Sequence, residues 1–417
     1  MANNILVILK QKVDEHPDKE AVVTYDAKLV RKALTFQEFW TLGARCASLL
    51  KEHGMKRYDN VLITVPLCLE YYVISFGIMM AGGVPVPMKK LQAQGKALAE
   101  TVRLAETAMA LFQAEDQDTT WDLLRHDIQV QKGTNNLVGS VQRSDMPLLK
   151  TAFLVRRRSA GNAQSFMDIL KSRQDEYVDL ELSPADGCCT VLSMNLEKMW
   201  CFKIVEISHR ALMNMARNWA KKFPEAESLY FPYPWYAGLG IPYDTLCGWT
   251  RIMPDQWETG EHLDIQATMV GAYKVVNAVV GPQDVNHMLD TLKEERGPYM
   301  DTLVVGGGVL TEDIIARCRK VAKNVYVTYS TSECLYMTLQ NIEKGAKFEN
   351  FYAGKVEDNI QLKILDKQHE EVPVGEVGQI AVKSNTLYTR YLREPVMNRQ
   401  AWTRDGWYLT NDAGYIR

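Results

Sequence analysis

The sequence predicts an α/β protein with two parallel-sheet α/β subdomains followed by a small antiparallel β-barrel. In the first part, short apolar runs alternate with helical patterns at the spacing of parallel βαβ units. After Gly354 the runs follow a two-residue period and are separated by turns near residues 366 and 374. A chain of 417 residues is too long for one ordinary domain, so we expect subdomains that share a core. The expected boundaries are residues 1–186, 187–355 and 356–417.

Helices are predicted from apolar periodicity and from the residues that begin and end them. The clearest start is Thr35, an N-cap whose capping-box partner is Glu38, and the clearest end is A-G-G after residue 80. The predicted helices cover residues 4–14, about 36–52, 69–80, 96–104 and 208–222.

Strands are predicted where short runs of apolar and β-branched residues end at small or polar residues. Alternation of these runs with the helices favours parallel sheets as far as residue 329. The predicted strands cover residues 21–25, 60–65, 84–87, 109–112, 190–193, 275–280, 303–305, 325–329, 359–364 and 378–382, with further alternation near Tyr388.

Composition narrows the class of protein. A net charge of −3 gives no electrostatic case for binding nucleic acid. The eight cysteines form no C-x-x-C pair, which favours reduced thiols over zinc or disulfides. The N-terminus has no signal-peptide pattern, and no apolar run reaches the roughly 18 residues of a membrane span. We therefore expect a soluble cytoplasmic protein without a membrane span.

The stretch Y-V-T-Y-S-T-S-E at residues 326–333 has the features of a nucleotide site. It follows a predicted strand, and three glycines at 306–308 follow the strand before it. Ligands of doubly wound sheets bind where strands end, and glycines there let the backbone approach a ligand closely. Ser332 and Glu333 offer a hydroxyl and a carboxylate suited to a phosphate and its metal, and Asp412 is an acidic group suited to ribose hydroxyls.

Six motifs in register make the chain resemble the acyl-adenylate-forming superfamily of acyl- and aryl-CoA synthetases, peptide-synthetase adenylation domains and luciferases. The resemblance covers nearly the whole chain and implies the fold of the large N-terminal domain of these enzymes. The motifs are A-G-G-V-P-V-P at 81–87, S-H-R-A-L at 208–212, G-G-G-V-L at 306–310, Y-S-T-S-E at 329–333, G-E-V-G-Q-I at 375–380 and D-G-W-Y-L-T-N-D at 405–412.

The resemblance also implies roles for individual residues. Glu333 would hold the magnesium that bridges the ATP phosphates, and Ser332 would contact phosphate. Asp412 would bind the ribose, Tyr329 would stack on adenine, and Gly307 and Gly308 would line the acyl and adenine pockets. The segment P-Y-P-W-Y-A-G at 232–238 is similar to the family's acyl gate, which places Trp235, Tyr236 and Gly238 in the substrate pocket. Its aromatic character favours a plain carboxylic acid over an amino acid.

The chain departs from the family at the phosphate loop. In place of a glycine-rich loop it has N-L-E-K-M-W-C-F-K-I at 195–204, in which only Lys203 aligns with the loop lysine. Glycines let backbone N–H groups converge on an anion, whereas Trp200 and Phe202 would fill that space. Ser330 and Asn411 also replace glycines. The sequence ends before the family's hinge and small C-terminal domain, so we expect the lysine-bearing domain to be absent.

Each residue also has a structural interpretation. Glu333 would then be a helix-start carboxylate and Asp412 a turn residue, although the family register favours ligand roles. Lys203 is either a phosphate contact or a solvated lysine at a strand end, and His209 is interpreted as a structural cap rather than a base.

Two hypotheses for the function remain open. In the first, the protein activates a fatty or aryl carboxylic acid as an acyl-adenylate, and Lys203, Ser332 and Glu333 take part in catalysis. The acyl group then passes to CoA or to the phosphopantetheine of an acyl carrier protein, with ATP, AMP and magnesium as the implied cofactors. In the second, the protein is a catalytically silent relative that binds an acyl-adenylate or a carrier protein.

Overall fold

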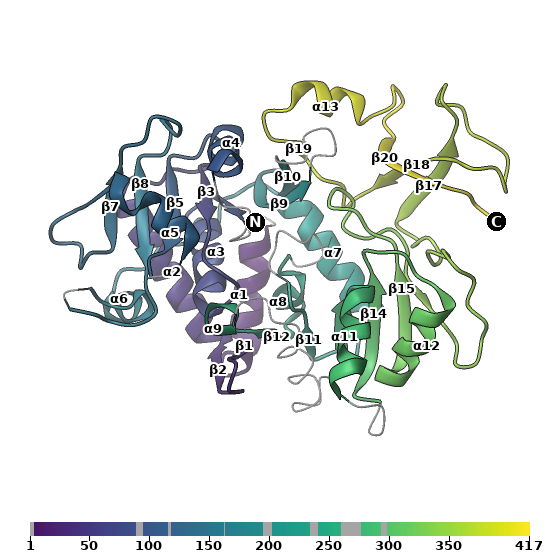
Figure 1. Cartoon of the computed structure of the whole chain (residues 1–417), viewed down its shortest axis with the longest axis horizontal. Coiled ribbons are helices and arrows are strands. Elements are labelled where there is room, and N and C mark those ends of the chain that lie inside the picture. The colour runs from purple at the N-terminus through teal and green to yellow at the C-terminus, as the bar shows by residue number, and fades with distance from the viewer. Residues whose placement is uncertain are drawn as a thin grey trace.

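The computed structural model describes residues 4–88, 95–115, 118–161, 163–194, 202–233, 241–259, 277–292 and 298–417. Two large sheets with helices packed against them make up most of this part of the chain, and two three-stranded sheets complete it (Figure 1). The α/β fold class predicted from the sequence is therefore confirmed.

A six-stranded sheet is built from the first part of the chain. Its parallel section places β5 between β3 and β8, as expected for βαβ units, and β7 and β6 add an antiparallel edge. The sheet order is β4 (Val84–Pro87), β3 (Asn60–Ile63), β5 (Met109–Gln113), β8 (Thr151–Val155), β7 (Val138–Val141) and β6 (Ile128–Val130).

An eight-stranded sheet is parallel except at its two edges. The order is β16 (Gln340–Asn341), β15 (Ala322–Thr328), β14 (Met300–Gly306), β13 (Asn277–Val280), β11 (Ser228–Tyr230), β12 (Thr250–Pro254), β1 (Glu20–Tyr25) and β2 (Arg31–Thr35). The N-terminal strand β1 pairs in parallel with β12, with Tyr25 opposite Pro254. The sheet therefore combines strands from both ends of the first 341 residues, which strand prediction alone does not reveal.

Local signals place most of the helices. Asn4 caps α1, and Thr35 and Glu38 form the predicted capping box of α2. The apolar helix predicted over residues 69–80 is α3, and it is buried on all sides. The helices are α1 (Ile5–Glu15), α2 (Phe36–Glu52), α3 (Leu69–Met80), α4 (Gly95–Ala105), α5 (Thr119–Leu124), α6 (Phe166–Ser172), α7 (His209–Lys222), α8 (Tyr243–Cys247), α9 (Gln256–Thr259), α11 (Pro282–Leu292), α12 (Glu312–Val321) and α13 (Pro395–Gln400), with a 3-10 turn at Arg125–Asp127.

The part predicted as a small antiparallel β-barrel is present as an antiparallel three-stranded sheet of β17 (Ile360–Leu365), β18 (Gly378–Ser384) and β20 (Tyr408–Gly414). The segment near Tyr388, which we expected to join this unit, belongs elsewhere. It leads into β19 (Arg390–Tyr391), which pairs with β10 (Phe202–Ser208), itself the partner of β9 (Gly187–Met194). The end of the predicted phosphate-loop stretch is therefore a β-strand.

Arg157 joins the two large sheets. It follows β8, and its guanidinium donates to Glu70 at the start of α3 (3.0 Å) and to Asp255 after β12 (2.9 Å). All three side chains are buried, so each charge depends on its partners. This ion-pair cluster and the apolar core shared by α1, α2, α3 and α7 fix the two sheets relative to each other. Among the described residues, no helix has the length and apolar character that crossing a membrane requires.

Candidate functional site

The carboxyl ends of four parallel strands meet at one edge of the eight-stranded sheet. In sheet order these strands are β15, β14, β13 and β11. The segments that follow them along the chain begin at Tyr329, Gly307, Gly281 and Phe231. Because ligands of open α/β sheets bind outside the carboxyl ends of the strands, this edge is the natural place for a site.

Lys203 and Glu333 form an ion pair at this edge. Lys203 lies on β10 and Glu333 in the turns after β15, and Nζ of Lys203 is 2.6 Å from Oε1 of Glu333. The hydroxyl of Tyr391, on β19, donates to the same Oε1 at 2.8 Å. Glu333 is only 3% exposed, so these two donors compensate a carboxylate that water reaches poorly.

Tyr391 was not predicted to be a site residue. Its ring packs against that of Tyr388, which in turn contacts the rings of Trp402 and Tyr408, and its hydroxyl lies 3.3 Å from the hydroxyl of Tyr408. Burial, followed by the negative charge of Glu333, raises the pKa of Tyr391 above its ordinary value. The hydroxyl therefore remains a protonated donor to Glu333 at neutral pH.

Tyr329 and Asp412 form a second contact close to the first. The hydroxyl of Tyr329 donates to Oδ2 of Asp412 at 2.6 Å, which brings β20 against the segment after β15. Burial, and then this hydrogen bond, raise the pKa of Tyr329 above its ordinary value. Asp412 itself is exposed. An exposed carboxylate oriented by a tyrosine can accept hydrogen bonds from a polar ligand.

The backbone near these contacts has two positions in the left-handed region. Gly307 has φ +78°, is exposed, and a Cβ added to it would meet no atom within 4 Å. Asn411, which replaces a family glycine, has φ 64°, and asparagine is among the residues that tolerate this region best. Ser330, the other replacement, is not among the positive-φ residues, so the structure has no need of glycine there.

The remaining predicted residues have different outcomes. Ser332 is half-buried beside Glu333, and Gly308 is exposed beside Pro282, the first residue of α11. The predicted pocket residues Trp235, Tyr236 and Gly238 lie outside the described residues, as does the loop stretch 195–201. The structure shows that the described site residues lie together at the sheet edge. Their roles in binding a ligand remain predictions.

The structural interpretations weighed for these residues need correction. Glu333 lies in turns that begin no helix, and Asp412 lies in strand β20 rather than in a turn. Lys203 is a strand residue as expected, but its ammonium is paired instead of solvated. The cap of α7 is Ser208, whose hydroxyl accepts the N–H of Ala211, and His209 is the buried first residue of the helix.

The donor set does not make a resident magnesium site. Oε1 of Glu333 already accepts from an ammonium and a hydroxyl, and a cation at that oxygen would have to displace Lys203. Within the described ranges, no three His, Cys, Asp or Glu side chains are grouped so that they could hold a metal ion. Magnesium is usually held by one or two carboxylates together with substrate phosphates. Here a single carboxylate, neutralised by lysine, does not suffice alone.

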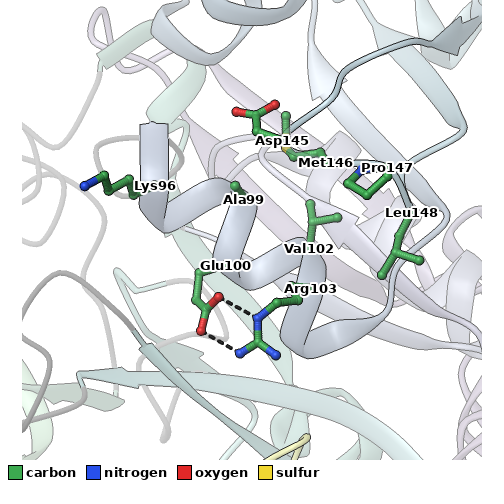
Figure 2. Close-up of a pocket in the computed structure, with 9 residues that line it drawn as sticks. All are labelled: Lys96, Ala99, Glu100, Val102, Arg103, Asp145, Met146, Pro147 and Leu148. Carbon is green, nitrogen blue, oxygen red and sulfur yellow. Dashed lines mark hydrogen bonds and ion pairs between the residues drawn. The ribbon is translucent and has the colours of Figure 1, made fainter.

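A hollow of about 350 Å³ lies elsewhere, between α4 and the segment 145–148 (Figure 2). Apolar side chains such as Val102 and Leu148 and charged ones such as Lys96 line it. It contains none of the predicted site residues, and the acidic Glu100 at its rim is paired with Arg103. Convergent polar groups define a functional site better than volume does, so we place the site at the sheet edge.

The fold and the polar edge place the chain among the α/β proteins that carry a candidate ligand site at the carboxyl ends of parallel strands. More particularly, the chain belongs to the AMP-binding enzyme family, whose model matches residues 9–166 and 203–392. The stretch between these two matches includes residues 195–202, whose sequence differs from the family's glycine-rich phosphate loop, whereas Lys203 begins the second match.

Individual relatives agree with this assignment. The chain is 22% identical over 438 residues to a long-chain-fatty-acid–CoA ligase of Bacillus subtilis, which covers 98% of this chain and 74% of the relative. A match to 2-succinylbenzoate–CoA ligase of Enterococcus faecalis is 30% identical but spans 116 residues, only 23% of that enzyme. Among solved structures, the inhibitor-bound N-terminal domain of FACL13 from Mycobacterium tuberculosis has a TM-score of 0.81 at 19% identity, covering 99% of this chain and 97% of that one.

Proposed function

We propose that this chain is the nucleotide-binding part of an acid–thiol ligase, which activates a carboxylic acid as an acyl-adenylate. The acyl group would then pass to the thiol of CoA or of a carrier protein's phosphopantetheine. The observation that carries the proposal is the double contact of the 329–333 segment, with Asp412 through Tyr329 and with Lys203 through Glu333. Residues from three sheets thus meet at the edge where a nucleotide would bind.

Asp412 is the proposed ribose-binding group. Its carboxylate is exposed and its Oδ2 is fixed by Tyr329, so the group is oriented before a ligand arrives. A carboxylate that accepts from two ribose hydroxyls makes charge-assisted hydrogen bonds. Gly307 leaves the space above the end of β14 free of a side chain, which suits a base or sugar lying close to the backbone.

Lys203 is proposed to provide the positive charge at the place where the acid reacts with ATP. In the first half-reaction an oxygen of the acid would bond to the α-phosphorus of ATP while pyrophosphate leaves. In the second, the thiol would attack the acyl carbonyl and release AMP. The carboxylate of the acid and the phosphates of ATP bring negative charge together in the first step. The ammonium of Lys203, held in place by Glu333, could offset this charge. We derive no step through magnesium, because Glu333 is already paired.

A second candidate function is a silent relative that binds an acyl-adenylate or a carrier protein without catalysis. The specific observation in its favour is the same ion pair, since a lysine neutralised by Glu333 at 2.6 Å has less charge to offer a triphosphate. The loop sequence, which lacks the family's glycines, points the same way. The two candidates share the nucleotide site and differ only in turnover.

The deciding experiment has two arms. Calorimetric titration would compare AMP, a non-hydrolysable acyl-adenylate analogue and ATP with magnesium, and we expect ATP to bind most weakly. Acid-dependent exchange of labelled pyrophosphate into ATP would then be measured over fatty and aryl acids with the longest form of the protein. Exchange that is lost in Lys203→Met but kept in Lys222→Met, a half-exposed control, supports the ligase. Absence of exchange with intact adenylate binding supports the silent relative, and absence of all binding contradicts both.

A further inference from the structure

A buried carboxylate lies two strands along the sheet from the proposed nucleotide site. Asp284 is the third residue of α11, the helix that follows β13, and its side chain is 3% exposed. Strand β13 pairs with β14, whose end carries Gly307, and with β11, whose last residue is Tyr230. Asp284 therefore shares the sheet edge at which the nucleotide is proposed to bind.

One oxygen of Asp284 is fully used by the protein. Oδ2 accepts the backbone N–H of Gly281 at 2.8 Å, the reciprocal half of a capping interaction at the start of α11. The same oxygen accepts the hydroxyl of Tyr233, which follows β11. These two donors explain why an acidic residue is stable at this helix end. They do not explain why its second oxygen is buried without a hydrogen bond.

The second oxygen, Oδ1, is buried and has no hydrogen-bond partner. The hydroxyl of Tyr230, fully buried nearby, also has none. Burial, together with the charge of Asp284, raises the pKa of Tyr230, so its hydroxyl stays protonated. Native proteins rarely leave buried polar groups unsatisfied, so each such group calls for an explanation, such as a bound water, an ion or a ligand. Among the described residues, neither of these two buried groups has a hydrogen-bond partner.

We propose that Oδ1 of Asp284, flanked by Tyr230 and Tyr233, is the polar end of the acyl pocket and receives a hydrogen-bond donor of the acid substrate. The substrate class is then a carboxylic acid that carries a hydroxyl or an amino group away from its carboxylate. This inference rests on the proposed function, because it places the acyl chain along the sheet edge from the nucleotide site. It narrows the fatty or aryl acids expected from the sequence to those with a hydrogen-bond donor, and it departs from the expectation of a plain carboxylic acid.

The chemistry of the pocket selects a donor rather than an acceptor. A carboxylate oxygen only accepts while ionised, so a carbonyl or an ether brought against it would leave both groups unsatisfied. An unsubstituted acyl chain would leave Oδ1 and the Tyr230 hydroxyl buried without partners. Sites built to hydrogen-bond a substrate group discriminate strongly against analogues that lack it.

The test uses matched acids on the full chain in the presence of AMP. The probes are benzoate, para-hydroxybenzoate and para-aminobenzoate, with hexanoate and its terminal hydroxy and amino derivatives as the aliphatic set. Binding is followed by calorimetry and by the rise in melting temperature. We expect at least one substituted acid to bind roughly tenfold or more tightly than its unsubstituted parent. A preference confined to terminal aminohexanoate would identify an ammonium, and a preference for the hydroxy acids would identify a neutral donor.

The variant Asp284→Asn adds a second test, because it replaces the acceptor Oδ1 by a hydrogen-bond donor. The amide oxygen must stay on the Gly281 N–H, which turns the amide N–H₂ toward the pocket and replaces an acceptor by a donor. The preference for substituted acids should then disappear. Asp290→Asn on the same helix, at an exposed position, is the matched control and should keep it.

The two proposals fail in different ways. If AMP binds but every substituted acid binds no better than its parent in the native protein, the Asp284 inference is wrong and the nucleotide site stands. If AMP and the acyl-adenylate analogue do not bind at all, the proposed function fails first. The comparison of acids in the native protein decides the inference even if the Asp284 variant does not fold.

Discussion

The hydroxyl of Tyr329 donates to Oδ2 of Asp412 at 2.6 Å, although 83 positions separate the two residues in the chain. The contact ties strand β20 of the small sheet to the segment that follows β15 of the large one. It also fixes one oxygen of an exposed carboxylate and leaves the other for a ligand. The first prediction follows from this arrangement.

Replacing Asp412 by Asn should weaken AMP binding at least tenfold. Each hydrogen bond from a ribose hydroxyl to a carboxylate contributes about 1.5–3 kcal/mol, and the amide keeps only one acceptor. Because Asp412 is exposed, the melting temperature should change little. Calorimetric titration with AMP measures the affinity. Asp405→Asn, at an exposed position just before β20, is the control and should bind AMP normally. Unchanged affinity in Asp412→Asn would remove it from the site.

Replacing Lys203 by Met should destabilise the protein by about 3 kcal/mol. The change leaves the buried carboxylate of Glu333 with the Tyr391 hydroxyl but without a compensating charge. The double variant Lys203→Met, Glu333→Gln removes both charges and should recover most of the loss. Urea unfolding followed by tryptophan fluorescence gives the free energies. The half-exposed pair of Lys222 and Glu357 should show a much smaller effect. Equal losses in both pairs would mean that Glu333 is not effectively buried.

His209 should make the protein less stable in mild acid. Burial lowers the pKa of His209 to about 4, against an unfolded value near 6.5. Between these values the unfolded chain binds the extra proton, so the free energy of unfolding rises with pH. From pH 7.5 to pH 5 this one group should cost roughly 2 kcal/mol.

The measurement is the difference between the native protein and His209→Gln in urea unfolding at several pH values. The native protein should lose more stability than the variant as the pH falls from 7 to 5. His16→Gln, at an exposed position, should follow the native curve. Parallel curves for the native protein and His209→Gln would show that His209 protonates as easily in the folded state as in the unfolded chain.

Asn411 should tolerate glycine better than alanine. At φ 64° a Cβ with no compensating side-chain polarity costs about 1 kcal/mol, whereas glycine adopts this region freely. Both variants lose the bond between Gln379 and the Asn411 side chain, so their difference isolates the backbone conformation. Thermal unfolding of the two variants measures it. A more stable alanine variant would contradict the left-handed conformation.

Local features were predictable because their causes are local. The bounds of α3, the capping box at Thr35 and the strand β4 follow from residues within one or two turns of each other. That a ligand site would lie at a sheet edge was predictable, since parallel strands end at the same edge. Glu333, Lys203, Tyr329 and Asp412 do meet there, so the family register identified residues that converge in space.

What remained hidden depends on distant pairing. The first three residues of β10, Phe202 to Ile204, were interpreted as the end of a phosphate loop, although F-K-I-V-E-I-S has the apolar content of a strand and pairs with β9 over its whole length. Tyr391 reaches Glu333 only because β19 pairs with β10, and no local sequence pattern predicts that pairing. Asp284 looks like an ordinary helix-start carboxylate until its free oxygen is seen.

The pairing of β1 with β12 also has a consequence for synthesis of the protein. Tyr25 emerges from the ribosome early, but its partner Pro254 follows roughly 230 residues later, which at typical elongation rates is on the order of 10 to 50 seconds. During that interval Val22 and Val23, which are buried in the finished sheet, lack β12 as their neighbouring strand. The N-terminal strand therefore completes its place in the sheet only after residues 250–254 have been synthesised.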